Sequence, residues 1–207
     1  MRRIMQAGFC ALMLAGAPLA QDGFAIPTLS DFENESHRAF FESIANRIEG
    51  FLREGGLAVH VFHEPGSGRI AGYGLERDGP VVVAVDVTVN NVVPLAEEYV
   101  FGAGIAIRRE AGTFYALLTD GTDYLLTAWV DARVVQRLGG TLPERPDDTP
   151  IRLELREAGA GVEFLVDGES RGSVSDSRIQ GREAGLAVFG AGSYFFDNLY
   201  FTTQNHE

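Results

Sequence analysis

The sequence contains no lysine and only one cysteine, Cys10. All 17 basic residues of the 207-residue chain are arginines. Without a lysine amine the chain cannot form Schiff bases, attach pyridoxal phosphate or build a Walker phosphate-binding loop. Beyond Cys10 there is no thiol for disulfides, iron–sulfur clusters or cysteine-bound zinc. The folded part must therefore be stabilised by its hydrophobic core.

Acidic residues outnumber basic residues. The 29 acidic residues give a formal net charge of −12 and an isoelectric point near 4.7. Such a negative surface repels the phosphates of nucleic acids and anionic lipid headgroups. Hydrophobic residues make up 45% of the chain and charged residues 22%, which is typical of globular proteins. We therefore expect a folded domain that does not bind nucleic acid.

Residues 1–20 have the pattern of a secretory signal peptide. Arg2 and Arg3 begin the chain, residues 7–20 are uncharged and mostly apolar, and a small-residue segment ends at Ala20 before the polar Gln21. The apolar run is too short for a membrane span. The pattern predicts cleavage near Ala20, a periplasmic or secreted protein, and no membrane insertion after cleavage. Because cleavage removes two arginines and no acid, the net charge of −12 would become −14.

The rest of the chain divides into a leader (21–56), one β-domain (57–203) and a short tail (204–207). In the leader, Phe40, Ile44 and Ile48 recur at helical spacing. Ser36 is a suitable N-cap, and the Gly55-Gly56 pair would end a helix. We therefore expect one short helix within residues 36–53.

From residue 57 onward, short apolar runs alternate with turn signals. Asp-Gly pairs at 78–79, 120–121 and 167–168 are typical of β-hairpins. Many short strands without helices between them indicate an antiparallel sandwich or barrel. The longest loop is expected at 140–150. The expected strands are residues 57–62, 69–75, 81–89, 101–108, 113–119, 124–130, 151–156, 162–166, 171–174, 185–189 and 194–203.

Strand alternation predicts a candidate binding face. We assign one apolar set of each middle strand, such as Ile105, Phe114 and Leu126, to the core. The opposite positions, set among small Gly and Ala residues, would then form a concave trough. Aromatic rings can stack on sugars, and Arg, Asp and Thr can bind their hydroxyls, so the trough is a candidate carbohydrate site. Its expected residues are Asp86, Arg108, Tyr115, Thr127 and Trp129, with Asp131 just beyond the last strand.

Seven segments form a recurrent pattern: a Gly-rich strand ending in Arg (102–108), a tyrosine strand (114–117), and residues 123–126, 151–154, 162–169, 185–189 and 196–201. Together they resemble the concanavalin A-like lectin/glucanase jelly-roll superfamily. The resemblance covers residues 57–203 and implies an antiparallel two-sheet sandwich. The superfamily includes lectins, laminin-G-like adhesion modules and family-16 hydrolases, so it implies a fold rather than one function.

The catalytic Glu-x-Asp-x-Glu strand of the family-16 hydrolases is absent. One alternative is nevertheless a glycoside hydrolase or lyase that acts on a polysaccharide, using Asp86 and Asp131 around Arg108, since such enzymes need two carboxylates at a defined separation. A second alternative is a structural envelope protein that binds no small ligand.

Loop aspartates offer oxygen ligands of the kind that calcium prefers, at Asp120, Asp123, Asp147 and Asp148. No other cofactor is expected. The hypothesis that the sequence favours is an exported, non-catalytic module that binds carbohydrate or a cell-surface polymer.

Overall fold

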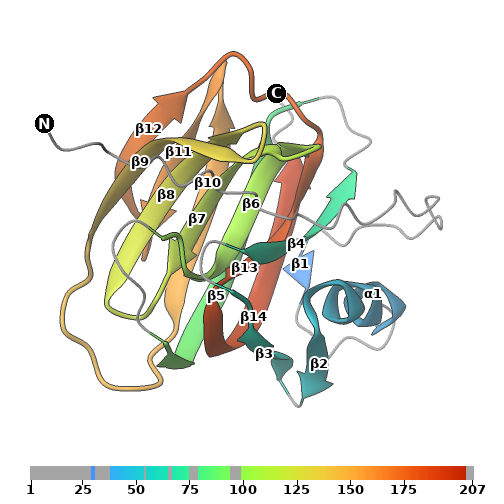
Figure 1. Ribbon diagram of the computed structural model, residues 1–207, viewed down its shortest axis with the longest axis vertical. Coiled ribbons are helices and arrows are strands. Elements are labelled where there is room, and N and C mark those ends of the chain that lie inside the picture. Colours follow the sequence, from blue (N-terminus) through green and yellow to red (C-terminus); the bar gives the residue numbers. More distant parts are fainter. Residues whose placement is uncertain are drawn as a thin grey trace, which may run out of the picture.

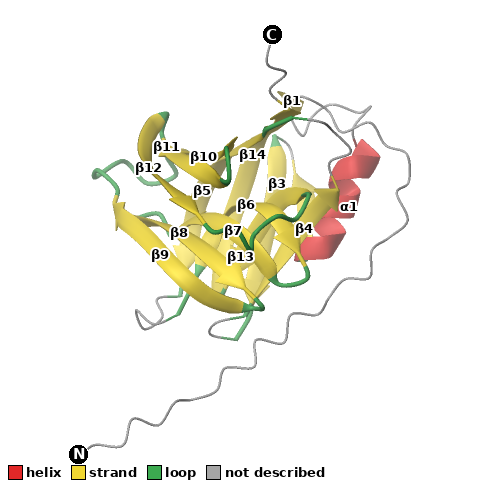
Figure 2. Cartoon of the chain, turned by 90° about the horizontal axis from the view of Figure 1, so that it is seen from above, coloured by secondary structure: helices red, strands yellow, loops and turns green. Residues whose placement is uncertain are grey.

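The computed structural model describes residues 29–30, 38–53, 55–64, 67–74, 79–93 and 99–203. These residues form two antiparallel sheets packed face to face, with one helix beside them (Figures 1 and 2). The predicted all-β, jelly-roll sandwich with one short helix is confirmed. The predicted signal peptide and tail lie outside the described residues.

The first sheet, sheet A, has the strand order β12-β11-β10-β5-β14-β3-β2, and β1 pairs with β14. Strands distant in sequence are neighbours here, because β14, near the C-terminus, lies between β3 and β5 (Figure 1). The bounds are β1 Leu29–Ser30, β2 Gly50–Arg53, β3 Gly56–Phe62, β5 Val81–Val92, β10 Ile151–Ala158, β11 Gly161–Val166, β12 Glu169–Ser175 and β14 Ala191–Thr203.

The second sheet, sheet B, has the order β4-β13-β6-β7-β8-β9. Its four consecutive strands β6 to β9 are joined by short turns, as the hairpin signals predict. The bounds are β4 Gly68–Gly74, β6 Gly102–Glu110, β7 Thr113–Thr119, β8 Asp123–Val130, β9 Arg133–Thr141 and β13 Glu183–Phe189.

Strand β9 was not expected from the sequence, and the prediction of a loop beginning at residue 140 is wrong for Gly140 and Thr141. Adjacent glycines disfavour a strand when local preference alone is considered. The strand forms because it pairs with β8 along its length, with Gly139 opposite Leu125 and Gly140 opposite Tyr124.

The predicted helix is confirmed at α1, Arg38–Ile48, whereas residues 50–53 form β2 instead. Glu49 ends the helix with a left-handed φ of 60°, so the chain turns before it reaches the glycine pair. The apolar face of α1, including Phe41 and Ile44, is buried against the side of the sandwich (Figure 2). Among the residues that the structure describes, no helix has the length and apolar character that a membrane span requires.

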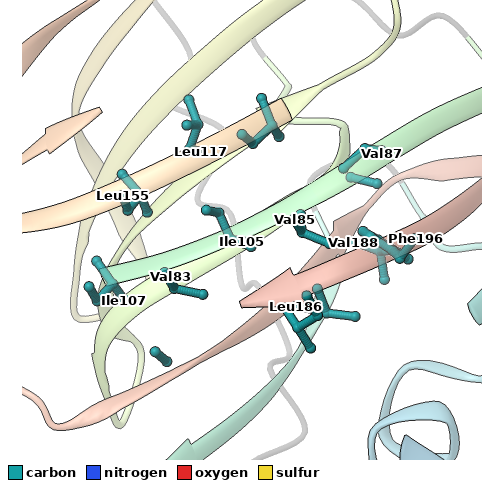
Figure 3. Packing of buried hydrophobic residues seen from close by; sticks show 14 of the residues in the cluster. Val83, Val85, Val87, Ile105, Ile107, Leu117, Leu155, Leu186, Val188 and Phe196 are labelled. Carbon is teal, nitrogen blue, oxygen red and sulfur yellow. The ribbon is translucent and has the colours of Figure 1, made fainter. Parts of the chain in front are cut away.

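The main core fills the space between the sheets. Alternate residues of β5 and β6 point into it, among them Val83, Val85, Ile105 and Ile107, and all four are buried (Figure 3). The period-2 alternation of these two strands therefore identified their buried face correctly.

Candidate functional site

The six residues of the predicted trough do not share a face. They lie in five different places: the outer face of sheet A, one end of the sandwich, the main core, the outer face of sheet B, and a turn. The prediction of one continuous trough is therefore wrong, and each residue has a separate structural setting.

Asp86 belongs to β5 and so to sheet A, not to the sheet of the other five residues. Its carboxylate accepts hydrogen bonds from the Arg152 guanidinium at 3.1 Å and from the Asn198 side-chain amide at 2.7 Å. Alternation placed Asp86 opposite the core correctly, but it could not show which sheet β5 joins.

Arg108 lies at the end of the sandwich, between the sheets. Its φ of 54° and the break in β6–β7 register after Ile107 mark a β-bulge, which redirects the side chain. Its Nε donates to Glu157 Oε1 at 2.8 Å, and its other nitrogens donate to the carbonyls of Gly159 and Ala160. Arg108 therefore joins β6 of sheet B to the β10–β11 hairpin of sheet A.

Tyr115 is fully buried in the main core, not on the outer face. Strand β7 has apolar residues on both faces, so alternation alone could not tell which set points inward. Tyr115 points inward and pairs with Ile107 on β6, so the prediction that Phe114 faces the main core is wrong. Its hydroxyl reaches the end of the sandwich, where it accepts the backbone N–H of Asp176 at 2.7 Å. Burial raises the pKa of this hydroxyl.

Thr127 and Trp129 do lie on the outer face of sheet B, but both are buried. The Trp129 indole stacks against Phe114 and Phe189 with centroid distances of 5.3 and 5.5 Å. Its Nε1 donates to the Thr127 hydroxyl at 2.8 Å. Only 4% of Trp129 is exposed, so this ring offers no open platform to a ligand. The whole group, called the outer cluster below, consists of Val100, Ala106, Phe114, Ala116, Leu118, Trp129, Ala187 and Phe189.

Asp131 is exposed in the two-residue turn between β8 and β9. Asp131 and Ala132 both have left-handed φ values, 51° and 59°, as the tightest hairpin turns require. The carboxylates of Asp86 and Asp131 therefore belong to different sheets, and Arg108 is engaged elsewhere. The proposed catalytic set of these three residues is not brought together.

A groove that the sequence reasoning missed continues from the outer cluster, beside the β7–β8 turn. Its volume is about 480 Å³. Leu118 and Leu125 provide apolar floor, and Tyr99 and Phe101, just before β6, provide half-buried aromatic walls. This cavity is called the β9 groove. Its lining is Tyr99, Phe101, Leu118, Thr119, Asp120, Asp123, Tyr124, Leu125, Arg137, Gly139, Gly140 and Thr141.

Strand β9 forms the far side of the groove. Because the sequence did not predict this strand, it did not predict the groove either. Arg137 pairs with Thr127 on the outer face of β8 and is exposed. At Gly139 a Cβ atom would lie 2.7 Å from the Tyr124 carbonyl oxygen, so no side chain fits there. One signal was available: in Tyr99-Val100-Phe101, period-2 alternation groups Tyr99 and Phe101 on one side of the chain.

The β7–β8 turn holds the acidic end of the groove in a fixed geometry. Asp120 Oδ1 accepts the N–H groups of Thr122 at 2.8 Å and Asp123 at 2.7 Å. The Thr119 hydroxyl donates to the Asp123 carbonyl and accepts the N–H of Gly121. Asp123 itself is exposed, so its carboxylate faces solvent from a rigid turn.

Two tyrosines lie behind this end of the groove. The ring of Tyr124 packs across Gly140, where a Cβ atom would come within 2.6 Å of the Tyr124 hydroxyl oxygen. The Tyr194 hydroxyl is buried and has no hydrogen-bond partner among the described residues. Burial raises the pKa of Tyr194, and the nearby charge of Asp120 raises it further. Tyr124 therefore forms part of the groove wall, and the buried Tyr194 lies in the main core near Asp120.

The aspartates proposed for calcium do not form a coordination cluster. Within the described part of the chain, no three His, Cys, Asp or Glu side chains are grouped to hold a metal ion. Asp120 Oδ1 is already engaged by two N–H groups of its own turn. Since calcium takes six to eight oxygen ligands, the pair Asp120 and Asp123 supplies too few.

Comparison with known proteins supports the fold. No protein-family model matches the sequence, and no curated protein matches it. Among solved structures, the xyloglucan PUL GH43B of Bacteroides ovatus matches with a TM-score of 0.59 and 16% identity, over 87% of this chain and 40% of that chain. The carbohydrate-binding module CBM66 from Bacillus subtilis matches with a TM-score of 0.53 and 14% identity, over 74% of this chain and 91% of that one.

A functionally unknown protein from Saccharomyces cerevisiae is similar as well, with a TM-score of 0.51 and 11% identity over 76% of this chain and 92% of that one. At these identities the likeness shows the fold alone. The protein thus shares the two-sheet jelly-roll sandwich of these structures, and the superfamily resemblance of residues 57–203 stays a prediction.

Proposed function

We propose that this protein is a non-catalytic carbohydrate-binding module whose ligand occupies the β9 groove. The observation that carries the proposal is the composition of this groove. It combines three aromatic residues, an apolar floor, two carboxylates and a guanidinium in one cavity of about 480 Å³. Ligand sites are typically apolar and aromatic cavities with a few fixed polar groups.

The rings of Tyr99 and Phe101 suit the apolar C–H face of a sugar, and Leu118 and Leu125 continue that apolar surface. Hydroxyls of the sugar need both acceptors and donors. Asp123 provides acceptor oxygens and Arg137 provides N–H donors from the facing strand. The arrangement therefore offers both kinds of contact that a polyhydroxylated ligand requires.

Two further observations support a binding role over catalysis. The carboxylate of Asp120 is used within its own turn, so Asp123 is the one groove acid without such a role among the described lining residues. Glycoside hydrolysis ordinarily needs two carboxylates. CBM66, which shares the fold over most of its length, is itself a carbohydrate-binding module.

Asp123→Asn is expected to weaken binding of a cognate oligosaccharide about tenfold, because hydrogen bonds to a charged group contribute about 1.5–3 kcal/mol. A glycan array probed with the chain from Gln21 onward identifies the oligosaccharide, and isothermal titration calorimetry measures the affinity of the parent and variant proteins.

Asp147→Asn is the matched control, because Asp147 is an exposed loop aspartate away from the groove lining. Equal losses in the two variants would contradict the assignment of the groove. Turnover of the oligosaccharide would favour the hydrolase or lyase instead. Absence of binding to any glycan would favour a structural envelope protein.

We also propose that the protein is exported to the periplasm or secreted. The charged, apolar and small segments of residues 1–20 support this. Mass spectrometry of material recovered outside the cytoplasm is expected to show a chain that begins near Gln21. Full-length protein retained in the cytoplasm would contradict the proposal.

A further inference from the structure

A second cavity, the end pocket, lies at the opposite end of β6 from the β9 groove. The groove contains Phe101, just before the first residue of β6, whereas the end pocket contains Arg108 near its last residue. The volume of the end pocket is about 450 Å³. Its walls come from the start of β5, the β10–β11 hairpin and the loop between β12 and β13.

The floor of the end pocket is a closed ion pair. The side chains of Arg108 and Glu157 are only 13% and 17% exposed and meet at 2.8 Å. Glu157 Oε2 accepts the N–H of Val81 at 2.8 Å, so both of its oxygens are engaged. The floor therefore carries no net charge and neither attracts nor repels an anion strongly.

The rim, by contrast, carries a cation without a partner. Only Arg53, Arg133 and Arg182 among the described arginines lack an ion pair or hydrogen bond, and only Arg182 lines either of the two cavities. Its neighbour Glu183 pairs with Arg109 and does not neutralise it.

Other charges of this loop are also accounted for. Arg178 forms an ion pair with Asp176, and its hydrogen bonds hold the pKa of that carboxyl at about 2. Ser177 and Gln180 line the pocket beside Arg182, and the Gln180 amide donates to the Ser177 carbonyl at 2.5 Å. The Ser177 hydroxyl and the Gln180 side-chain oxygen therefore accompany one free guanidinium.

We propose that the end pocket is a second binding site, which takes a ligand with a carboxylate, of the size and polarity of a sugar acid. A guanidinium matches a carboxylate in a two-bond, planar geometry, and this rim offers one such group. A phosphate dianion would require more positive charge than Arg182 alone supplies in so acidic a protein. The hydroxyl of Ser177 and the side-chain oxygen of Gln180 belong to residues that line the same pocket, and such groups suit sugar hydroxyls. This proposal does not depend on the function of the β9 groove.

The test uses the chain from Gln21 onward, titrated with glucuronate, with neutral glucose and with acetate, and followed by ¹H–¹⁵N NMR. Glucuronate is expected to shift the Gly181 and Gly159 amides and the Arg182 Nε–H, with at least tenfold higher affinity than glucose. Arg182→Gln is expected to lower the affinity for glucuronate at least tenfold. Arg53→Gln, which removes an exposed arginine outside the pocket, is expected to leave it unchanged.

Acetate distinguishes the two sources of a carboxylate. Glucuronate binding that is tenfold tighter than acetate supports a sugar acid, whereas equal binding supports a carboxylate site for a smaller acid. Three results would overturn the proposal: equal affinity for glucose and glucuronate, an unchanged affinity in Arg182→Gln, or no saturable shift up to about 50 mM, a weaker affinity than small-ligand sites show.

Discussion

Trp129→Ala is expected to lower the free energy of unfolding by about 3–5 kcal/mol, the usual cost of deleting a large buried aromatic ring. The ring is 4% exposed, stacks on Phe114 and Phe189, and donates a hydrogen bond to Thr127. Its removal leaves a cavity in the outer cluster and deprives the buried Thr127 hydroxyl of its hydrogen-bond donor. Urea denaturation measured by circular dichroism gives the difference directly.

Two controls make this result specific. Phe62→Ala removes an aromatic ring that is 89% exposed, and is expected to change stability by less than about 0.5 kcal/mol. Trp129 is also the only tryptophan, so its fluorescence in the parent protein should be blue-shifted and protected from acrylamide. A stable Trp129→Ala protein with quenchable parent fluorescence would mean that the ring is open to ligands after all.

Arg108→Met is expected to cost about 3 kcal/mol of stability, because removing one partner of this largely buried ion pair leaves the charge of Glu157 without compensation. The variant loses three hydrogen bonds, to Glu157, Gly159 and Ala160, which link the end of β6 in sheet B to the β10–β11 hairpin of sheet A. Chemical denaturation of the parent and variant measures this cost.

A second substitution tests whether the uncompensated charge of Glu157 causes the loss of stability. Glu157→Gln in the Arg108→Met background should recover part of the loss, since the amide oxygen still accepts the N–H of Val81. Arg156→Ala breaks the more exposed pair with Glu154 and is expected to cost only about 0–1 kcal/mol. If Arg108→Met were no more damaging than Arg156→Ala, the connection between the sheets would not matter for stability.

Local pattern predicted most strands because their turns and their alternation are local properties. Strand β7 begins and ends where its apolar run does, at Thr113 and Thr119. Strand β9 escaped detection because Gly139 and Gly140 disfavour a strand locally, and only pairing with β8 overrides that preference. Since β9 provides one side of the groove, the candidate site was missed together with the strand.

The same distinction separates the correct and incorrect residue assignments. For β6, one apolar face beside a Gly- and Ala-rich face was enough to bury Ile105 and Ile107. For β7, both faces are apolar, so the sequence alone allows Tyr115 to face either way. In the folded protein Tyr115 faces inward, where its hydroxyl accepts the backbone N–H of Asp176. Alternation also could not show that the outer face of sheet B has a buried cluster of its own around Trp129.

The amino-acid sequence by itself determined the fold class, the hairpins and the inward faces of β5, β6 and β8, because period-2 alternation and turn chemistry act over a few residues. Tertiary structure decided which sheet each strand joins, where the bulge turns Arg108, and which charges remain unpaired at the end pocket. Those features depend on contacts between residues distant along the chain, such as Arg108 with Glu157, and no local pattern encodes such contacts.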